Sequence, residues 1–295
     1  MIGTWAKQLR VHQWVKNLLV LVPALASFQL FDSALWGELV LAMVSLSLVA
    51  SSVYIFNDLS DAPNDRLHPI KRNRPIAAGL ISAPVGVIVA LCLLVAGLVL
   101  AYLAGVLFFV SVLVYLATTF GYTFYLKQVV LVDCLTLASL YTIRVVAGGV
   151  ATGIQLSFWL LAFSIFMFAS LAWVKRYAEL EALKAEGKVS AKGRGYSVGD
   201  QPLVLAFGVG SAFIAVLIFA LYIDSDAIKA EYAVPQIAWL AIPVLMYVIG
   251  RIWLKANRGQ MNEDPILFVL RDVPSLVSAA VIAAALIVAH VGFTR

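Results

Sequence analysis

Three carboxylates and an amide lie close together between Asn57 and Asp65, at the end of a long apolar run. If this stretch is helical, Asp58, Asp61 and Asp65 occupy positions i, i+3 and i+7 and share one face. Like charges this close repel one another unless cations lie beside them. Mg²⁺ suits such a group, because it binds a few carboxylates together with substrate phosphates. We therefore predict a magnesium site formed by Asn57, Asp58, Asp61 and Asp65, with a solvated acidic loop as the alternative.

A group of cations follows within ten residues and consists of Lys71, Arg72 and Arg74. Such residues ordinarily set membrane topology and extend their charged ends to the interface. A diphosphate needs several donors besides a metal ion, however, and Arg supplies them in a rigid fork while Lys acts as a point charge. We expect at least one of the three to contact a substrate phosphate. Within the acidic stretch, Pro63 removes a helical amide donor, so we expect the helix to kink or end there.

The N-terminal stretch R-V-H-Q-W-V-K-N, residues 10–17, places Gln13, Lys16 and Asn17 on one helical face beside an aromatic side chain. It is either an aromatic and basic membrane anchor or a part of the phosphate site. Arg144 lies well inside an apolar run, where an unpaired guanidinium costs at least ~2.5 kcal/mol. We expect it to face the bundle interior and to pair with a carboxylate or an anionic ligand. Asp133, on the same face of that helix, is expected to line the same pocket.

Two more groups lie at the cytoplasmic ends of expected helices. Tyr122 and Lys127 follow the fourth apolar run, where Lys127 is either a topology determinant or a ligand contact. Lys175, Arg176 and Glu179 end the sixth run in the sequence K-R-Y-A-E-L-E. The second and sixth runs point the same way, so their charged ends are expected to face each other across a central cavity open to the cytoplasmic side.

The composition indicates that a lipid bilayer surrounds these groups. The chain is 63% hydrophobic and 13% charged, and its mean hydropathy is +0.97, far outside the soluble globular range. Its apolar runs have the length of membrane-spanning helices, which favours an all-α bundle over a barrel. We expect one domain, residues 1–295, with nine transmembrane helices. They lie at about 17–31, 36–56, 84–103, 105–124, 129–150, 156–174, 202–222, 236–253 and 274–292.

The Lys and Arg residues fall mostly on one side of this arrangement, with eighteen on that side against Lys229 and Arg295 on the other. The positive-inside rule therefore places the N-terminus in the cytoplasm, and nine spans place the C-terminus outside. The net charge of +5 follows from this rule and from anionic lipids, so it does not indicate nucleic acid. Cys92 and Cys134 lie within apolar runs and form no C-x-x-C pattern, which predicts neither a disulfide framework nor a zinc site.

These motifs resemble the UbiA superfamily of intramembrane prenyltransferases, whose N-D-x-x-D-x-x-x-D magnesium motif Asn57, Asp58, Asp61 and Asp65 match at every defined position. Within it, the segments Q-W-V-K-N, D-R-x-H-P-x-K-x-x-R-P-I-A-A-G, I-R-V-V-A-G-G-V-A-T and K-R-Y-A-E-L look like those of the decaprenyl-phosphate phosphoribosyltransferase group. The likeness covers most of residues 10–200. It implies a bacterial inner-membrane enzyme of cell-envelope biosynthesis that uses Mg²⁺, phosphoribosyl pyrophosphate and a membrane polyprenyl phosphate.

The chain departs from the general superfamily at the sixth helix. Where classic prenyltransferases carry a second D-x-x-x-D motif, this chain has Lys175, Arg176 and Glu179. The departure makes a second all-carboxylate site doubtful and suits a substrate with an additional phosphate. The resemblance then implies a displacement at the ribose anomeric carbon, with Asp58, Asp61, Lys16 and Arg144 as catalytic residues. The other candidate residues named above bind the phosphates.

Two other functions remain open on the sequence alone. A true prenyltransferase that moves a polyprenyl group from its diphosphate to a small acceptor would use the same first motif. A secondary transporter would place its site near the bilayer midplane, whereas the charges here gather at one face. The sequence does not fix the length of the lipid or the oligomeric state, and a homo-oligomer is possible.

Overall fold

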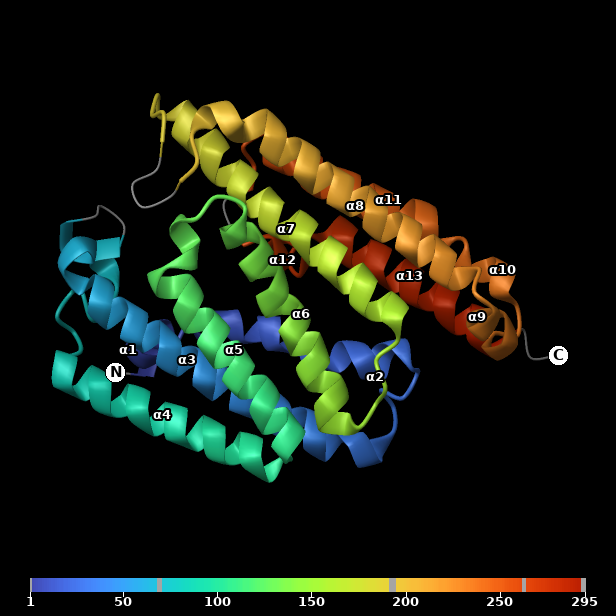
Figure 1. Ribbon diagram of the computed structural model, residues 1–295, viewed down its shortest axis with the longest axis horizontal. Coiled ribbons are helices and arrows are strands. Elements are labelled where there is room, and N and C mark those ends of the chain that lie inside the picture. Colours follow the sequence, from blue (N-terminus) through green and yellow to red (C-terminus); the bar gives the residue numbers. More distant parts are fainter. Residues whose placement is uncertain (1, 68–70, 191–194, 262–263, 293–295) are drawn as a thin grey trace. The chain divides into compact units, whose positions relative to one another are not determined.

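The computed structural model describes residues 2–67, 71–190, 195–261 and 264–292 and builds them almost entirely from helices (Figure 1). In this part of the chain, the only strand-like pairing is an isolated bridge between Ser190 and Ser197. The all-α prediction is therefore confirmed.

The helices form two compact units, residues 1–126 with 143–156, and residues 127–142 with 157–295. The first unit contains α1 (Ile2–Gln8), η1 (Val11–Leu21), α2 (Val22–Ala26), η2 (Ser33–Leu35), α3 (Trp36–Leu67), η3 (Lys71–Asn73), α4 (Ala83–Leu103), α5 (Val106–Phe124) and the second half of α6 (Val132–Thr152). The second unit contains the first half of α6, α7 (Phe158–Ala185), η5 (Val198–Asp200), α8 (Gln201–Ile223), α9 (Asp226–Glu231), α10 (Pro235–Ala238), α11 (Ala241–Asn257), α12 (Pro265–Val269) and α13 (Val273–Val291). The 3₁₀ turn η4 (Leu126–Gln128) lies at the boundary between the units.

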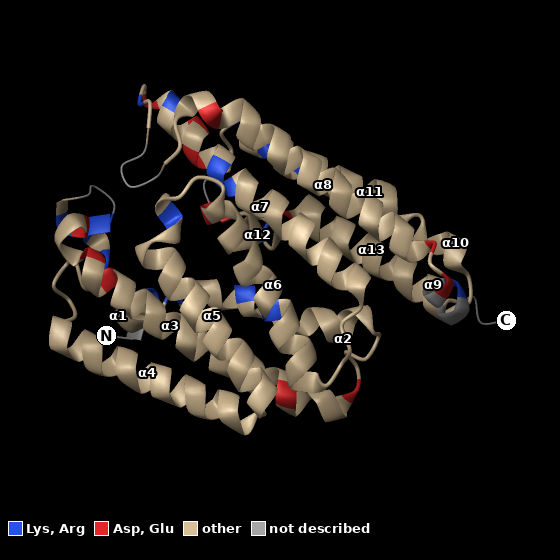
Figure 2. Cartoon of the chain, in the orientation of Figure 1, with Lys and Arg blue, Asp and Glu red and all other residues tan. Residues whose placement is uncertain are grey.

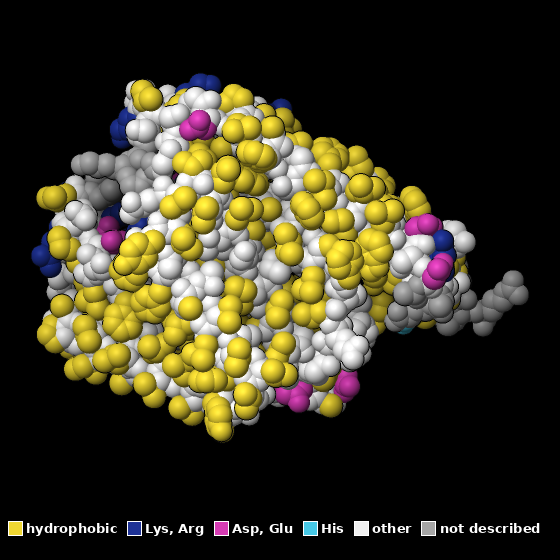
Figure 3. Space-filling model, viewed as in Figure 1, with side chains coloured by type: hydrophobic (Ala, Val, Ile, Leu, Met, Phe, Trp, Pro, Cys, Tyr) yellow, Lys and Arg dark blue, Asp and Glu magenta, His cyan; other side chains and the backbone are white. Residues whose placement is uncertain are grey.

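Eight helices in the described residues are long and apolar enough to cross a membrane, namely α3, α4, α5, α6, α7, α8, α11 and α13. Large hydrophobic side chains are exposed along several of them, including α4, α5 and α8, and Figure 3 shows how densely they cover the visible face. An apolar surface of this extent is suited to lipid rather than to water. Acidic and basic residues gather at helix ends, as where α3 ends (Figure 2).

The first expected span, 17–31, is not one long α-helix. The chain forms the 3₁₀ helix η1 up to Leu21, and α2 then begins with Pro23 in its first turn, a position that suits proline because its missing N–H has no helical partner there. The count of nine membrane-spanning helices is therefore not confirmed. The cause is local, since polar side chains of η1 bond to α3 and hold a helix with three residues per turn.

Two expected helix ends are wrong. The helix α3 does not stop at Pro63 or at the start of the expected loop near residue 57, but continues to Leu67. Pro63 lies only four residues before this end, so it removes a single bond near the terminus rather than in the middle of the helix. Similarly, α7 extends beyond its apolar run to Ala185. Hydropathy located the membrane-spanning parts and missed these polar continuations.

The contact between η1 and α3 follows the 3₁₀ repeat. Trp14, Asn17 and Val20 recur every three residues and lie on one side of η1, because residues i and i+3 eclipse in such a helix. The indole of Trp14 donates to Ser51 Oγ at 2.9 Å, and the Asn17 amide donates to Ser47 Oγ at 2.9 Å. The two serines are one α-helical turn apart on α3. Small hydroxyl residues thus let η1 lie close to α3 and satisfy its polar side chains.

The close approach of η1 to α6 depends on Gly148. A Cβ at this position would lie 2.1 Å from the carbonyl oxygen of Val20. We expect Gly148→Ala to lower the stability of the detergent-solubilised protein by about 1–3 kcal/mol, because backbone must move to accept the methyl group. Gly210→Ala on α8 is the matched control, since a Cβ there has nothing within 4 Å. Equal melting temperatures of both variants would contradict this account.

The second unit packs α7 against α8 and α11. The rings of Trp173 and Phe207 stack with centroids 5.4 Å apart, and the Trp253 indole donates to Ser170 Oγ at 3.1 Å. A Cβ at Gly208 would lie 2.1 Å from the Trp253 ring. The missing side chain of this glycine therefore makes room for the tryptophan between α8 and α11.

A bidentate ion pair joins α11 to the start of α13. Arg251 donates to the Asp272 carboxylate at 2.9 and 2.8 Å, and the same carboxylate caps α13 by accepting from the Ser275 backbone N–H. These bonds, that from Arg251 first, hold the pKa of Asp272 well below its usual range. The pair therefore stays ionised at neutral pH.

Candidate active site

The first polar cluster surrounds Asp58 at the end of α3. Asp58 is only 3% exposed, and its carboxylate accepts three hydrogen bonds. The donors are Gln8 at 3.0 Å, Arg10 at 2.7 Å and Arg74 at 3.1 Å. Two charged partners and one neutral one thus compensate a carboxylate that burial alone would disfavour.

Arg74 joins Asp58 to Asp65. One of its nitrogens, Nη1, lies 3.1 Å from Asp58 Oδ1 and 2.7 Å from Asp65 Oδ2. Asp65 is also 3% exposed. The same helical face carries Asp61, which accepts a hydrogen bond from the Asn57 side chain at 3.2 Å. The continuous helix α3 thus keeps the three carboxylates on the face that the sequence predicts, and a single guanidinium nitrogen bridges two of them.

The donor chemistry at this cluster fits a magnesium ion, but the side chains are arranged around arginine. In the described residues, no group of three or more His, Cys, Asp or Glu side chains is placed to hold a metal ion. Instead, Arg74 Nη1 occupies the point on which Asp58 and Asp65 converge. A cation is therefore already bound between them, and it belongs to the protein. Carboxylate oxygens in this position are ligands that Mg²⁺ prefers.

The remaining cations of this segment differ in exposure. Lys71 and Arg72 lie exposed in η3, whereas Arg74 is half-buried. Lys7 of α1 donates to the backbone carbonyl of Asn73 at 2.9 Å, which ties this turn to the N-terminal helix. Residues 68–70 of the sequence motif lie outside the described residues.

A second polar group of the first unit lies around Arg144. Its guanidinium donates to Asn17 Oδ1 and to the Tyr115 hydroxyl, both at 2.9 Å, and lies 4.7 Å from the centre of the Tyr115 ring. Lys16 is buried on η1, and Gln13 and Tyr122 are half-buried. The structure therefore brings Asn17 and Arg144 together. Tyr115 completes the group and was missed by the sequence analysis, because a tyrosine in an apolar run gives no signal of its polar contact.

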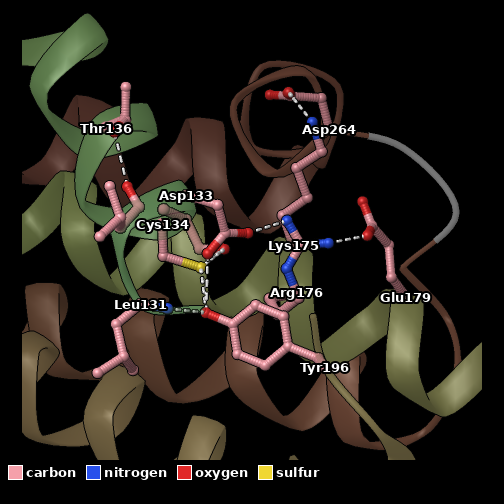
Figure 4. A network of polar contacts seen from close by, with 11 residues as sticks. Leu131, Asp133, Cys134, Thr136, Lys175, Arg176, Glu179, Tyr196 and Asp264 are labelled. Carbon is pink, nitrogen blue, oxygen red and sulfur yellow. Dashed lines mark hydrogen bonds and ion pairs between the residues drawn. The ribbon is translucent and has the colours of Figure 1, made fainter. Parts of the chain in front are cut away.

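The second charged cluster lies in the second unit, at the end of α7 and the start of α6 (Figure 4). Arg176 is 1% exposed and Asp133 is fully buried. Arg176 donates to Asp133 and to Glu179, and its guanidinium lies 5.3 Å from the centre of the Tyr196 ring. The Tyr196 hydroxyl donates to Asp133 at 2.8 Å, and burial raises its pKa. Arg176 therefore holds two carboxylates in place.

Lys175 points to a different partner from that of its neighbour. Its Nζ lies 4.0 Å from Asp264 Oδ2, and the Tyr141 hydroxyl donates to the same carboxylate oxygen at 3.4 Å. Lys175 is half-buried, as is Lys127 in η4. Of the two adjacent cations on α7, Lys175 is thus the more accessible to a ligand.

The sequence analysis missed several residues that complete the two clusters. Arg10 and Gln8 bond to Asp58, and Tyr196 and Asp264 join the second cluster. Arg10 belongs to the polar N-terminal stretch, so its signal was present but was assigned to topology. Tyr196 and Asp264 carry no motif that marks them, because their contacts depend on segments distant in sequence.

Comparison with known proteins identifies the family. Residues 18–271 match the UbiA prenyltransferase family. The chain belongs to this family. As a UbiA prenyltransferase with eight long apolar helices, it is a multi-pass integral membrane protein and a transferase.

Three relatives illustrate the range within this UbiA group. The chain is 37% identical to the uncharacterized protein y4nM of Sinorhizobium fredii over 98% of its own length, but spans only 56% of that protein. It is 34% identical to the nodulation protein NoeC of Azorhizobium caulinodans, covering 93% of this chain and 89% of that protein. It is 32% identical to the decaprenyl-phosphate phosphoribosyltransferase of Mycolicibacterium smegmatis, covering 90% and 86%.

Solved structures agree on the UbiA fold. A UbiA homologue from Archaeoglobus fulgidus, bound to GPP and Mg²⁺, superposes with a TM-score of 0.70 over 97% of this chain and 99% of that chain. The sequences are 18% identical. The likeness therefore extends to the whole helical architecture.

Proposed function

We propose that this UbiA-family transferase moves a 5-phosphoribosyl group from phosphoribosyl pyrophosphate to a polyprenyl phosphate and releases pyrophosphate. Similarity to decaprenyl-phosphate phosphoribosyltransferases supports this choice. The observation that carries it is the end of α7, where Arg176 bonds to Asp133 and Glu179. These carboxylates are neutralised by the protein itself. Lys175 beside them is then suited to an additional phosphate on the substrate.

The proposed reaction is a displacement at the anomeric carbon of the ribose. An oxygen of the lipid phosphate forms a bond to this carbon, and the bond to pyrophosphate breaks, so that its electron pair leaves with the pyrophosphate. Mg²⁺, when bound by Asn57, Asp58, Asp61 and Asp65, would supply positive charge beside the leaving group. The lipid phosphate is already an anion, so no strong general base is needed.

The side chains of this chain have separate tasks in that reaction. Arg74, with Lys71 and Arg72, binds the diphosphate. Lys175 binds the 5-phosphate. Gln13, Lys16, Asn17, Tyr122, Lys127 and Arg144 are proposed as further phosphate contacts, with Lys16 and Arg144 as the cations nearest the transferred group.

The proposed topology puts the first cluster on the cytoplasmic side, where soluble phosphosugars occur. The distribution of Lys and Arg supports a cytoplasmic N-terminus in a bacterial inner membrane. The eleven residues of η1 at ~2.0 Å each and the five of α2 at ~1.5 Å each extend over roughly 30 Å, which is about the thickness of a hydrocarbon core. This segment is thus long enough to cross despite its few residues, which supports an external C-terminus.

Ligand binding in detergent tests the choice of donor. With Mg²⁺ present, we expect phosphoribosyl pyrophosphate to bind and a short prenyl diphosphate to bind at least about tenfold more weakly, because Lys175 meets a phosphate only in the former. Calorimetry measures both. Lys175→Gln should remove most of the difference, whereas Lys188→Gln, on an exposed lysine paired with Glu186, should leave it. Binding of the prenyl diphosphate alone would favour a prenyltransferase and overturn the proposal.

A further inference from the structure

Two arginines occupy the carboxylates that the proposed reaction assigns to the metal ion. Arg10 lies 2.7 Å from Asp58, and Arg74 bridges Asp58 and Asp65. Both carboxylates are almost fully buried, whereas the arginine side chains remain 23% and 26% exposed. The arginines are thus the partners that can turn away from the pair, and the carboxylates are the partners that stay.

The backbone at Arg10 shows that this contact is built into the fold. Arg10 joins α1 to η1 with φ 51° and ψ 47°, in the left-handed region, where a residue with a side chain is uncommon and costs on the order of 1 kcal/mol. Its guanidinium also lies 4.7 Å from the centre of the Tyr54 ring on α3. The ring and the Asp58 carboxylate together hold the side chain over α3, and this packing offsets the backbone cost.

The charges of the cluster explain why a metal ion cannot simply be added. Asp58, Asp61 and Asp65 carry three negative charges, and Arg10 and Arg74 return two positive ones. A divalent cation entering alone must displace guanidiniums from buried carboxylates and leave them without these partners, which is costly. A divalent cation that arrives with a diphosphate brings oxygens to which the displaced guanidiniums can bond.

We propose that Arg10 and Arg74 exchange partners, from the α3 carboxylates to the diphosphate of the substrate, as Mg²⁺ takes their place. The exchange makes metal and diphosphate bind together, each strengthening the other to the same extent because such coupling is reciprocal. Arg10 is thereby a diphosphate-binding residue that acts against binding of metal alone. The inference rests on the proposed function only in that the substrate carries a diphosphate.

Calorimetry on the purified protein in detergent tests the exchange with two probes, Mg²⁺ alone and the preformed complex of Mg²⁺ with inorganic pyrophosphate. For the unmodified protein, we expect the complex to bind at least about tenfold more tightly than Mg²⁺ alone. For Arg10→Gln and Arg74→Gln, we expect opposite changes: Mg²⁺ alone binds roughly tenfold more tightly, and the complex binds roughly tenfold more weakly. Arg258→Gln, on an exposed residue that ends α11, is the control for total charge and should change neither affinity.

Each other result contradicts the exchange. If both variants weaken binding of both probes, the arginines only maintain the structure. If they weaken the complex and leave Mg²⁺ alone unchanged, they are phosphate ligands that do not compete with metal. A variant that does not fold leaves the other variant and the two affinities of the unmodified protein as tests. Because inorganic pyrophosphate is the probe, failure of the phosphoribosyl proposal would leave these results unaffected, and failure here would leave the donor assignment unaffected.

Discussion

Asp58→Asn is expected to lower kcat by a factor on the order of 10²–10³ while the protein still folds, because one carboxylate of the proposed metal site is lost where charge develops on the leaving group. Its amide can still accept a hydrogen bond, and Arg74 keeps Asp65 as a partner at 2.7 Å. The melting temperature in detergent should therefore change little. Initial rates and thermal unfolding measured on the same preparation separate the two effects.

The control for this substitution is Asp226→Asn, which makes the same chemical change on an exposed residue in the first turn of α9. It should retain the activity of the unmodified protein. Full activity of Asp58→Asn would show that the carboxylates of α3 do not bind the metal ion.

Arg176→Gln is expected to destabilise the protein by roughly 3–5 kcal/mol, because the substitution leaves the charge of the buried Asp133 uncompensated. Thermal or denaturant unfolding in detergent measures this loss. The double substitution Asp133→Asn with Arg176→Gln should be less destabilising than Arg176→Gln alone, since it removes the buried charge together with its partner.

Lys175→Gln is the matched control, because it removes the neighbouring cation from the same helical turn. It should leave stability nearly unchanged and raise the KM for phosphoribosyl pyrophosphate. The sequence analysis assigned phosphate binding to both residues. A stable Arg176→Gln variant that loses only affinity for the donor would support that assignment and contradict the role of Arg176 in holding Asp133 and Glu179.

The sequence predicted the helical class and the arrangement of the α3 carboxylates, because both depend on local periodicity. Asp58, Asp61 and Asp65 share a face on any helix. The conformation of η1 was not predictable in this way. Its three-residue repeat depends on bonds from Trp14 and Asn17 to serines of α3, and composition alone could not distinguish it from an α-helical span.

The partners of the charged residues were the least predictable part of the site. Arg10 reaches Asp58 across 48 positions of sequence, and Arg176 reaches Asp133 across 43. A motif shows which side chains are charged, but only packing decides whether a cation faces a ligand or a buried carboxylate. For this reason Arg10 was assigned to topology and Arg176 to phosphate.

The most direct test of the central claim is the identity of the lipid product. The purified protein is incubated with Mg²⁺, a polyprenyl phosphate and phosphoribosyl pyrophosphate, and the extracted lipid is analysed by mass spectrometry, with Asp58→Asn as the inactive reference. We expect a lipid whose mass has increased by one phosphoribosyl group, formed together with an equal amount of pyrophosphate. An unchanged polyprenyl phosphate, with turnover only when a polyprenyl diphosphate and a small acceptor are supplied, would contradict the proposed reaction.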